Sequence, residues 1–230
     1  MKNKFYTPML SGLMLLFSLT ISCKRDKTPS PLPPALTVTD IEGNVYQTVK
    51  IGNQIWTTQN LRTTKFNDGS SIPYVDVQAN WANLSTPGFA YYGFNSVLKA
   101  TYGPLYNYYA AKDPKIAPAG WHVPTAAEWQ TLLLALGANA GDKLKEIGTT
   151  HWAAPATNAT NESGFTALPG GLIDGGNGDL LQLFYTAAFW TSTETNATSA
   201  TNFQLVNGNS TVSSGSLLKS SGLSLRLVKD

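Results

Sequence analysis

The chain has 230 residues, of which only 13% are charged, so uncharged polar groups must make up most of its surface. The formal net charge of +2 arises at the N-terminus, because 11 basic and 13 acidic residues remain beyond residue 27. A nearly neutral domain without a basic stripe holds phosphates weakly, so we expect no nucleic-acid partner.

Residues 1–22 have the three parts of a lipoprotein signal peptide. Lys2 and Lys4 supply the positive start, and residues 10–21 form an apolar stretch. A helix over this stretch is too short to span a bilayer. Ser22 then provides a small residue before Cys23.

Cys23 is the single cysteine of the chain and follows the apolar stretch directly. It cannot form an internal disulfide, and its position predicts a lipid attachment site carrying acyl chains such as palmitate. Each buried methylene contributes about 0.8 kcal/mol, so several chains hold a protein on a membrane permanently. Lys24, rather than Asp, favours the outer membrane and a surface-exposed domain. The alternative is an ordinary signal peptide with an incidental cysteine.

Residues 23–36 form the lipidated cysteine and a linker. Its second half, residues 28–36, contains four prolines. Such a density gives an extended, semi-rigid spacer rather than a packed element. We therefore place the folded domain at residues 37–230.

The domain begins with strand signals. Residues 45–51 alternate, with Val45, Val49 and Ile51 expected on one face, and the Gly52-Asn53 pair separates them from a second strand at 54–58. This is the signature of a β-hairpin. A short strand is expected before it, at residues 36–39.

Two main helices are expected in the first half of the domain. The first covers residues 102–112. The second begins at a capping box formed by Thr125 and Glu128 and ends at Gly137. Its core-facing stripe has helical spacing and consists of Trp129, Leu132, Leu133 and Leu136. Residues 142–147 add a short helical turn.

The last third returns to strands. We expect strands at residues 189–192 and 203–206, a hairpin turn at Asn207-Gly208, and a closing strand in which Leu223, Leu225 and Leu227 alternate with other residues. The order of strands, helices and strands predicts an α+β fold with mainly antiparallel sheets.

These stretches together resemble the Fibrobacter succinogenes major paralogous domain, a family of exported bacterial modules. The motifs that carry the resemblance are Asp40-x-x-Gly43-Asn44-x-Tyr46-x-Thr48-Val49-x-Ile51-Gly52-x-Gln54-x-Trp56, Asn60-Leu61, Asp68-Gly69, Tyr102-Gly103-x-Leu105-Tyr106-Asn107, Pro118-x-Gly120-Trp121-His122-Val123-Pro124-Thr125-x-x-Glu128-Trp129, Gly164-Phe165-x-x-Leu168-Pro169-Gly170-Gly171, Phe189-Trp190-Thr191-Ser192 and Arg226-Leu227-Val228-Lys229-Asp230.

The resemblance implies a C-type-lectin-like fold that is distantly similar to the formylglycine-generating enzymes. It implies no activity, because fold analogy does not carry function. The generating enzymes use active-site cysteines, and the domain has none. It also lacks the Glu-Pro-Asn or Gln-Pro-Asp triplet of calcium-dependent lectins.

His122 and Glu128 are the first candidate site residues. Histidine titrates near neutral pH and serves as an acid or base. We favour a core histidine bonded to the backbone for His122, and the capping box for Glu128. His151, beside Trp152, has no obvious partner in the sequence.

An acidic, glycine-rich segment is a candidate calcium site. Asp174, Asn177 and Asp179, with Asn161 and Glu162 upstream, offer the oxygen ligands that calcium takes. The same residue types also form turns, and the spacing is not that of an EF-hand, so we predict no metal ligands and no cofactor.

Five aromatic residues could form a sugar-stacking platform or a protein contact, although aromatics in a small domain mostly belong to the core. They are Trp81, Tyr91, Tyr92, Trp152 and Trp190.

The sequence contains no catalytic signature such as a nucleophile elbow, a zinc-binding helix or a phosphate loop. We therefore predict a membrane-anchored, surface-displayed lipoprotein whose domain binds a glycan or a protein without catalysis. One alternative is an extracellular hydrolase acting on polymer through His122 and Asp174 or Asp179. Another is a structural envelope protein with a broad apolar patch.

Overall fold

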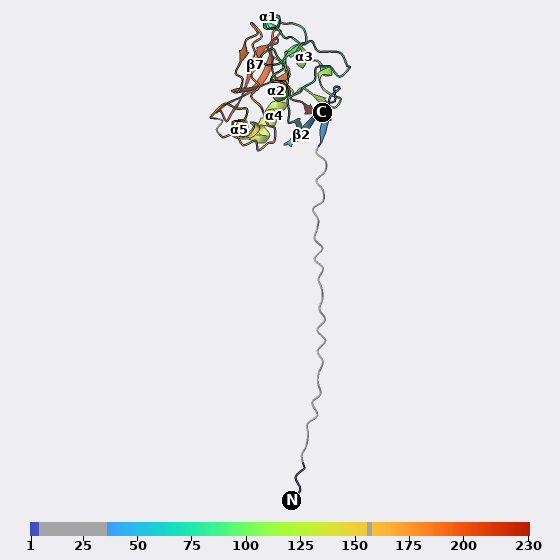
Figure 1. Cartoon of the computed structure of the whole chain (residues 1–230), viewed down its shortest axis with the longest axis vertical. Coiled ribbons are helices and arrows are strands. Elements are labelled where there is room, and N and C mark those ends of the chain that lie inside the picture. Colours follow the sequence, from blue (N-terminus) through green and yellow to red (C-terminus); the bar gives the residue numbers. More distant parts are fainter. Residues whose placement is uncertain (5–35, 156–157) are drawn as a thin grey trace. The chain divides into compact units, whose positions relative to one another are not determined.

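The computed structural model of the chain describes residues 1–4, 36–155 and 158–230, and Ala35–Asp230 form one compact unit (Figure 1). The predicted signal peptide beyond residue 4, Cys23 and the proline-rich linker lie outside the described residues. Among the described residues, no helix is long and apolar enough to cross a membrane.

The largest sheet joins the first and last strands of the unit. Its five strands have the order β1-β2-β3-β12-β6, and every neighbouring pair is antiparallel. The short strand β12 lies between β3 and β6, and its Val228 pairs with Trp56 on one side and with His122 on the other. The strands are β1 (Thr37–Thr39), β2 (Val45–Ile51), β3 (Gln54–Thr57), β6 (Trp121–His122) and β12 (Val228–Lys229).

The second sheet is an antiparallel meander in the order β11-β10-β9, with a register shift between Ala200 and Asn202. Two further sheets are short antiparallel pairs, β4 with β5 and β7 with β8. The bounds are β4 (Phe89–Ala90), β5 (Leu105–Tyr106), β7 (Leu172–Ile173), β8 (Leu180–Leu181), β9 (Thr186–Glu194), β10 (Ser199–Val206) and β11 (Val212–Leu218).

Most helices are single turns between these strands. They are α1 (Gln78–Trp81), α2 (Lys99–Tyr102), α3 (Tyr108–Ala111), the 3-10 turn η1 (Pro114–Ile116), α4 (Ala126–Leu136) and α5 (Ala140–Leu144). Antiparallel sheets with a few short helices confirm the predicted α+β class.

Helix α4 forms as the sequence predicts. The Thr125 hydroxyl accepts from the backbone N–H of Glu128, and a Glu128 carboxylate oxygen accepts from the backbone N–H of Thr125, so the capping box is complete. Gly137 ends the helix with φ 67°, a conformation that a side chain disfavours. Trp129 and Leu132 are buried, which confirms the core-facing stripe.

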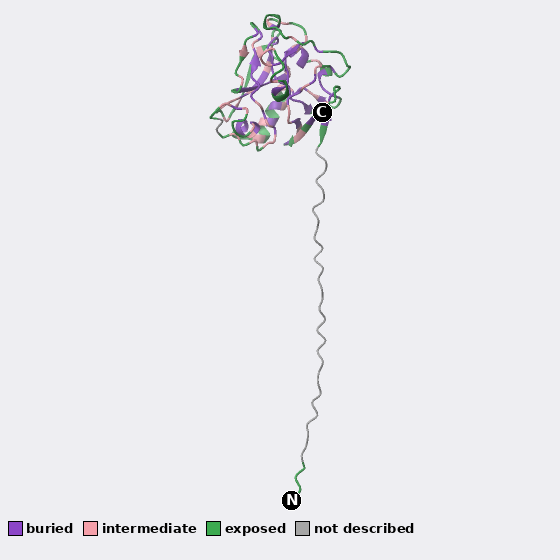
Figure 2. Cartoon of the chain, in the orientation of Figure 1, coloured by how far each residue is buried: buried purple, intermediate pink, exposed green. Residues whose placement is uncertain are grey.

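The core of the unit is built around aromatic rings. The ring of Trp129 stacks on that of Phe203 with centroids 5.1 Å apart and meets Trp56 edge-on at 5.2 Å. Phe165 and Phe189 complete the cluster. Such ring pairs stabilise beyond the area they bury. Figure 2 shows buried segments in the interior and exposed ones on the outer loops.

The helix predicted at residues 102–112 is wrong. Helix α2 ends at Gly103, which has φ 73°, and Pro104 cannot continue a helix. Strand β5 follows, and α3 then starts from Asn107, whose side chain accepts from the backbone N–H of Ala110.

Two strand predictions also need correction. In β2, Ile51 is buried as expected, but Val45 is 48% exposed and Tyr46, whose hydroxyl donates to Asp40, is buried instead. The expected closing strand consists of isolated bridges at Leu223 and Ser224 before β12. Its leucines are nevertheless fully buried. The hairpins at Gly52-Asn53 and Asn207-Gly208 are confirmed.

Candidate functional site

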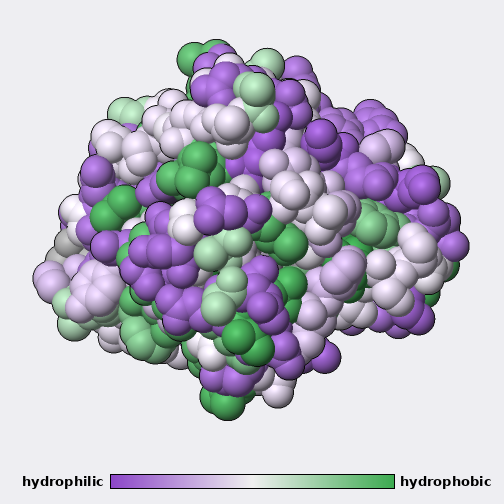
Figure 3. All heavy atoms as spheres, turned by 90° about the horizontal axis from the view of Figure 1, so that it is seen from above, coloured by the Kyte–Doolittle hydropathy of each residue, from purple (hydrophilic) through white to green (hydrophobic). Residues whose placement is uncertain are grey.

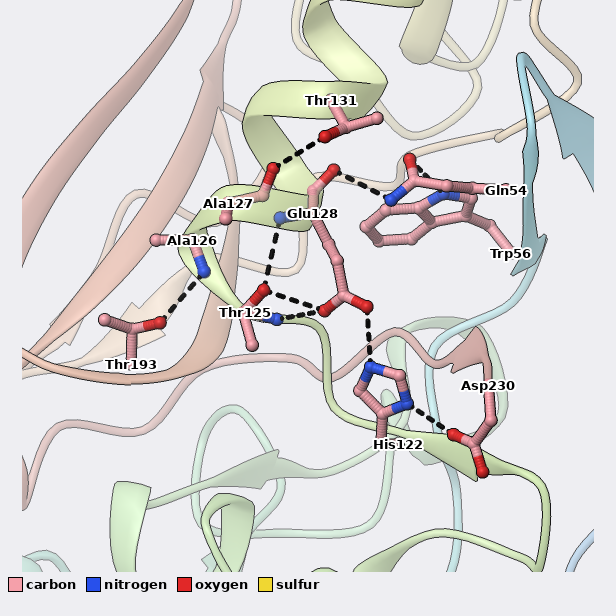
Figure 4. A network of polar contacts seen from close by, with 10 residues as sticks. All are labelled: Gln54, Trp56, His122, Thr125, Ala126, Ala127, Glu128, Thr131, Thr193 and Asp230. Carbon is pink, nitrogen blue, oxygen red and sulfur yellow. Dashed lines mark hydrogen bonds and ion pairs between the residues drawn. The ribbon is translucent and has the colours of Figure 1, made fainter.

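His122 lies between two carboxylates, as Figure 4 shows. Its Nε2 atom is 2.8 Å from an oxygen of Glu128, and its Nδ1 atom is 2.6 Å from an oxygen of Asp230. Pairing of β12 with β6 brings Asp230 beside His122, and the first turn of α4 supplies Glu128. We call this arrangement the His122 bridge.

The expectation that His122 bonds the backbone was therefore wrong. Its side chain is 36% exposed and bonds carboxylates rather than the backbone. The sequence could not reveal this, because Asp230 lies 108 positions away. Glu128 was expected to cap α4 alone, yet its second oxygen also contacts His122.

The carboxylates decide the charge of His122. Burial opposes the charged form, but the contacts with Asp230 and Glu128 outweigh it and raise the pKa of His122. Burial likewise acts to raise the pKa of Glu128, and the hydrogen bonds from Thr125 and the contact with His122 lower it. The bridge is strongest when the ring is an imidazolium that donates from both nitrogens.

The bridge leaves little scope for acid–base chemistry. A catalytic histidine needs one ring nitrogen facing a nucleophile or substrate. Here both nitrogens face carboxylates, and neither partner is Asp174 or Asp179. The bridge therefore ties β6, β12 and α4 together.

His151 has an acidic partner that the sequence did not suggest. Its Nδ1 atom lies 2.8 Å from one oxygen of Glu146 and 3.0 Å from the other. The ring of Tyr102 packs edge-on against the imidazole at 5.9 Å. Burial, followed by the charge of Glu146, raises the pKa of Tyr102 to about 12.

Glu146 and Tyr102 line a cleft of about 210 Å³ that we call the Arg226 cleft. Eight of its twelve lining residues carry a hydroxyl, amide or guanidinium group. They come from the segment after β3, from α2, from the residue that follows the α5 C-cap, and from the loop after Phe165. The lining residues that the argument uses are Asn60, Arg62, Tyr102, Glu146, Thr166 and Arg226.

Arg226 forms the buried wall of this cleft and is only 1% exposed. Its guanidinium donates to the side-chain oxygen of Asn60 and to the carbonyls of Thr57, Phe165 and Thr166. It also lies 4.4 Å from the ring centre of Phe165. Burial lowers the pKa of Arg226 to about 9, because the charged form loses favourable solvation when it is buried.

A second hollow of about 450 Å³ adjoins the cleft, since both have Arg62 and Ala100 in their walls. Lys99 and Glu42 line this hollow, which we call the Lys99 hollow. The cleft and the hollow together make the polar groove. Helix α2 contributes to both halves, so a short helix ended by Gly103 and Pro104 positions the site.

The acidic segment after β7 forms a turn. One oxygen of Asp174 accepts from the backbone N–H groups of Gly176 and Asn177, and Asp179 accepts from the side chains of Gln78 and Asn177. These bonds match the turn interpretation.

Asn161 and Glu162 contact other parts of the chain. Asn161 bonds Thr166, and Glu162 lies 4.0 Å from Lys143. The structure therefore does not bring the five candidate calcium ligands together. Within residues 1–4, 36–155 and 158–230, no cluster of three His, Cys, Asp or Glu residues could hold a metal ion.

Four of the five candidate aromatics, Trp81, Tyr91, Trp152 and Trp190, are buried, and Tyr92 is partly exposed. Among the described residues, the exposed aromatics are instead Tyr74, Phe184 and Tyr185. The sequence did not single out Phe184 and Tyr185, because β8 just before them is too short to show a pattern.

The groove residues were also missed as site residues. Asn60, Tyr102 and Arg226 appear in the family motifs, but nothing local shows that they meet. A lone arginine among leucines near the C-terminus was the one available signal, since arginine is seldom buried without a partner.

The residues of the motifs agree with a comparison of the sequence with models of known domain families. A sequence model described as the Fibrobacter succinogenes major domain matches residues 49–229. The chain belongs to this family. The Arg226 cleft lies wholly within the part that matches the Fibrobacter succinogenes major domain. No curated protein and no solved structure gives a significant match, so the C-type-lectin-like fold stays a prediction.

Proposed function

We propose that the chain is an outer-membrane lipoprotein, anchored through Cys23, whose surface-displayed domain binds an extracellular glycan or protein without catalysis. The leader, the single cysteine and the proline-rich linker support the anchor. The polar groove supports the binding role.

The polar groove is the observation that carries the proposal. Its cleft is smaller than the roughly 300–1,000 Å³ of sites for drug-sized molecules, and is suited to one sugar ring or one side chain. The adjoining hollow extends the groove for further units of a chain. The hydroxyl of the exposed Thr101 and the amide nitrogen of the half-buried Gln59 can form hydrogen bonds to a hydroxyl-rich ligand.

The two alternatives have less support. A hydrolase using His122 needs a free ring nitrogen, and both nitrogens contact carboxylates. A structural envelope protein needs a broad apolar patch. The face drawn in Figure 3 instead shows hydrophobic groups scattered among hydrophilic and neutral ones.

A glycan array, read with and without calcium, tests the binding role on the purified full chain in detergent. The exposed Ala100 belongs to both halves of the groove, so Ala100→Trp would block it. Ala197→Trp, on the exposed turn between β9 and β10, is the matched control. We expect binding by the wild type and the control, and loss in the Ala100 variant. Equal binding by all three proteins would place the ligand elsewhere.

A further inference from the structure

Three cations of the polar groove have no acidic partner among the residues that the structure describes. Arg62 donates to the carbonyl of Val45, and its guanidinium lies 5.0 Å from the ring centre of Tyr46. The ammonium of Lys99 lies 5.6 Å from the ring centre of Tyr91. In the described part of the chain, neither residue forms an ion pair with a carboxylate, and Arg226 forms none either.

The two carboxylates of the groove, in contrast, are already bonded within the protein. Glu42 accepts from the hydroxyls of Thr63 and Thr64 and from the backbone N–H of Thr64. Glu146 contacts His151 through both of its oxygens. The groove therefore keeps cationic donors available for a ligand, while its acidic acceptors are occupied.

The buried charge of Arg226 favours binding of an anion in the groove. A guanidinium has five N–H donors. Four of them bond Asn60, Thr57, Phe165 and Thr166, and one N–H on Nη2 has no bond among the described residues. A buried charge that faces only carbonyls and rings is costly, and a nearby carboxylate lowers that cost.

We propose that the polar groove binds a saccharide that carries a carboxylate, such as a uronate unit of an extracellular polysaccharide. The sugar ring occupies the Arg226 cleft, and its carboxylate faces Arg62 and Lys99. The hydroxyl and amide groups in the cleft wall favour a sugar over an acidic peptide, because a sugar unit carries several hydroxyl groups beside its one carboxylate. This inference rests on the proposed binding function and names its ligand class.

The test compares two matched ligands by calorimetry on the purified full chain in detergent. One is an oligogalacturonate, and the other is the same oligomer with its carboxylates reduced to alcohols. An acidic peptide, oligoglutamate, is the third ligand. We expect binding of the oligogalacturonate alone, weakened at high salt because salt screens exposed charges.

Arg62→Gln and Lys99→Gln should each weaken that binding about tenfold, since each removes a charge-assisted hydrogen bond. Lys50→Gln removes an equal charge from an exposed strand position outside the groove and should change nothing. Unfolding curves of the four proteins would confirm that each variant is folded.

The remaining outcomes separate the carboxylate inference from the proposed binding function. Equal binding of the acidic and reduced oligomers would overturn the carboxylate inference and leave glycan binding standing. Binding of oligoglutamate alone would overturn the saccharide inference. An oligogalacturonate affinity unaffected by the Arg62 and Lys99 substitutions would overturn the site. If no ligand bound here or on the array, the proposed function itself would fail.

Discussion

The Nδ1 atom of His122 lies 2.6 Å from a carboxylate oxygen of Asp230, and this contact joins β6 to the residue that follows β12. The other ring nitrogen contacts Glu128 on α4. One side chain therefore couples two strands of the largest sheet to the main helix. Because it titrates near neutral pH, the coupling depends on pH.

The His122 bridge should make stability depend on pH in a definite direction. Contacts with two carboxylates raise the pKa of His122 above 6.5, so its contribution is complete below pH 6.5 and is lost as the pH rises through the folded value. Glu128 has a lowered pKa, so its contribution is complete above pH 4.5 and is lost in acid.

The variant His122→Gln should therefore differ most from wild type between pH 4.5 and 6.5. The difference should stay within about 1 kcal/mol, because the ring is partly exposed. Denaturant unfolding of both proteins at pH 5.5 and pH 9 measures it. A larger difference at pH 9 would contradict the bridge.

The cap of α4 gives a second prediction. Thr125→Ala removes the hydroxyl that accepts from the backbone N–H of Glu128, and should cost about 1 kcal/mol of unfolding free energy. Thr131→Ala, the same substitution at an exposed position within the helix, is the control and should change stability by less than about 0.5 kcal/mol. If both variants lost the same unfolding free energy in urea, the Thr125 hydroxyl would contribute no more than the hydroxyl of an ordinary exposed threonine.

Arg226 gives the third prediction. Arg226→Met keeps an apolar side chain of similar length but leaves Asn60 and three backbone carbonyls without their donor. Loss of one side of a buried polar network should cost about 3–5 kcal/mol. Lys229→Met, on the exposed part of β12, is the control. A melting temperature in Arg226→Met equal to that of the control would refute a structural role for the guanidinium.

The elements that sequence reasoning found are those whose causes are local. Thr125 and Glu128 define the start of α4 within four residues, and Gly52-Asn53 defines a hairpin within two. The break at Gly103 and Pro104 was also local, yet the apolar spacing of residues 105–109 outweighed it. Glycine followed by proline should have ended the helix.

The site could not be predicted in the same way, because its contacts join distant segments. Arg226 bonds Asn60 across 166 positions, and His122 meets Asp230 across 108. A contact outside β2 also decided which side chain at the start of this strand is buried. The bond from the Tyr46 hydroxyl to Asp40 lets a polar ring be buried in place of Val45.

Anchoring through Cys23 is the claim on which surface display depends, and intact-mass measurement of the chain purified from membranes tests it most directly. The account predicts a chain that begins at Cys23 and carries the mass of attached acyl groups. Cys23→Ala should lose that mass and leave the membrane fraction. An unmodified Cys23, or a chain that keeps residues 1–22, would contradict the account.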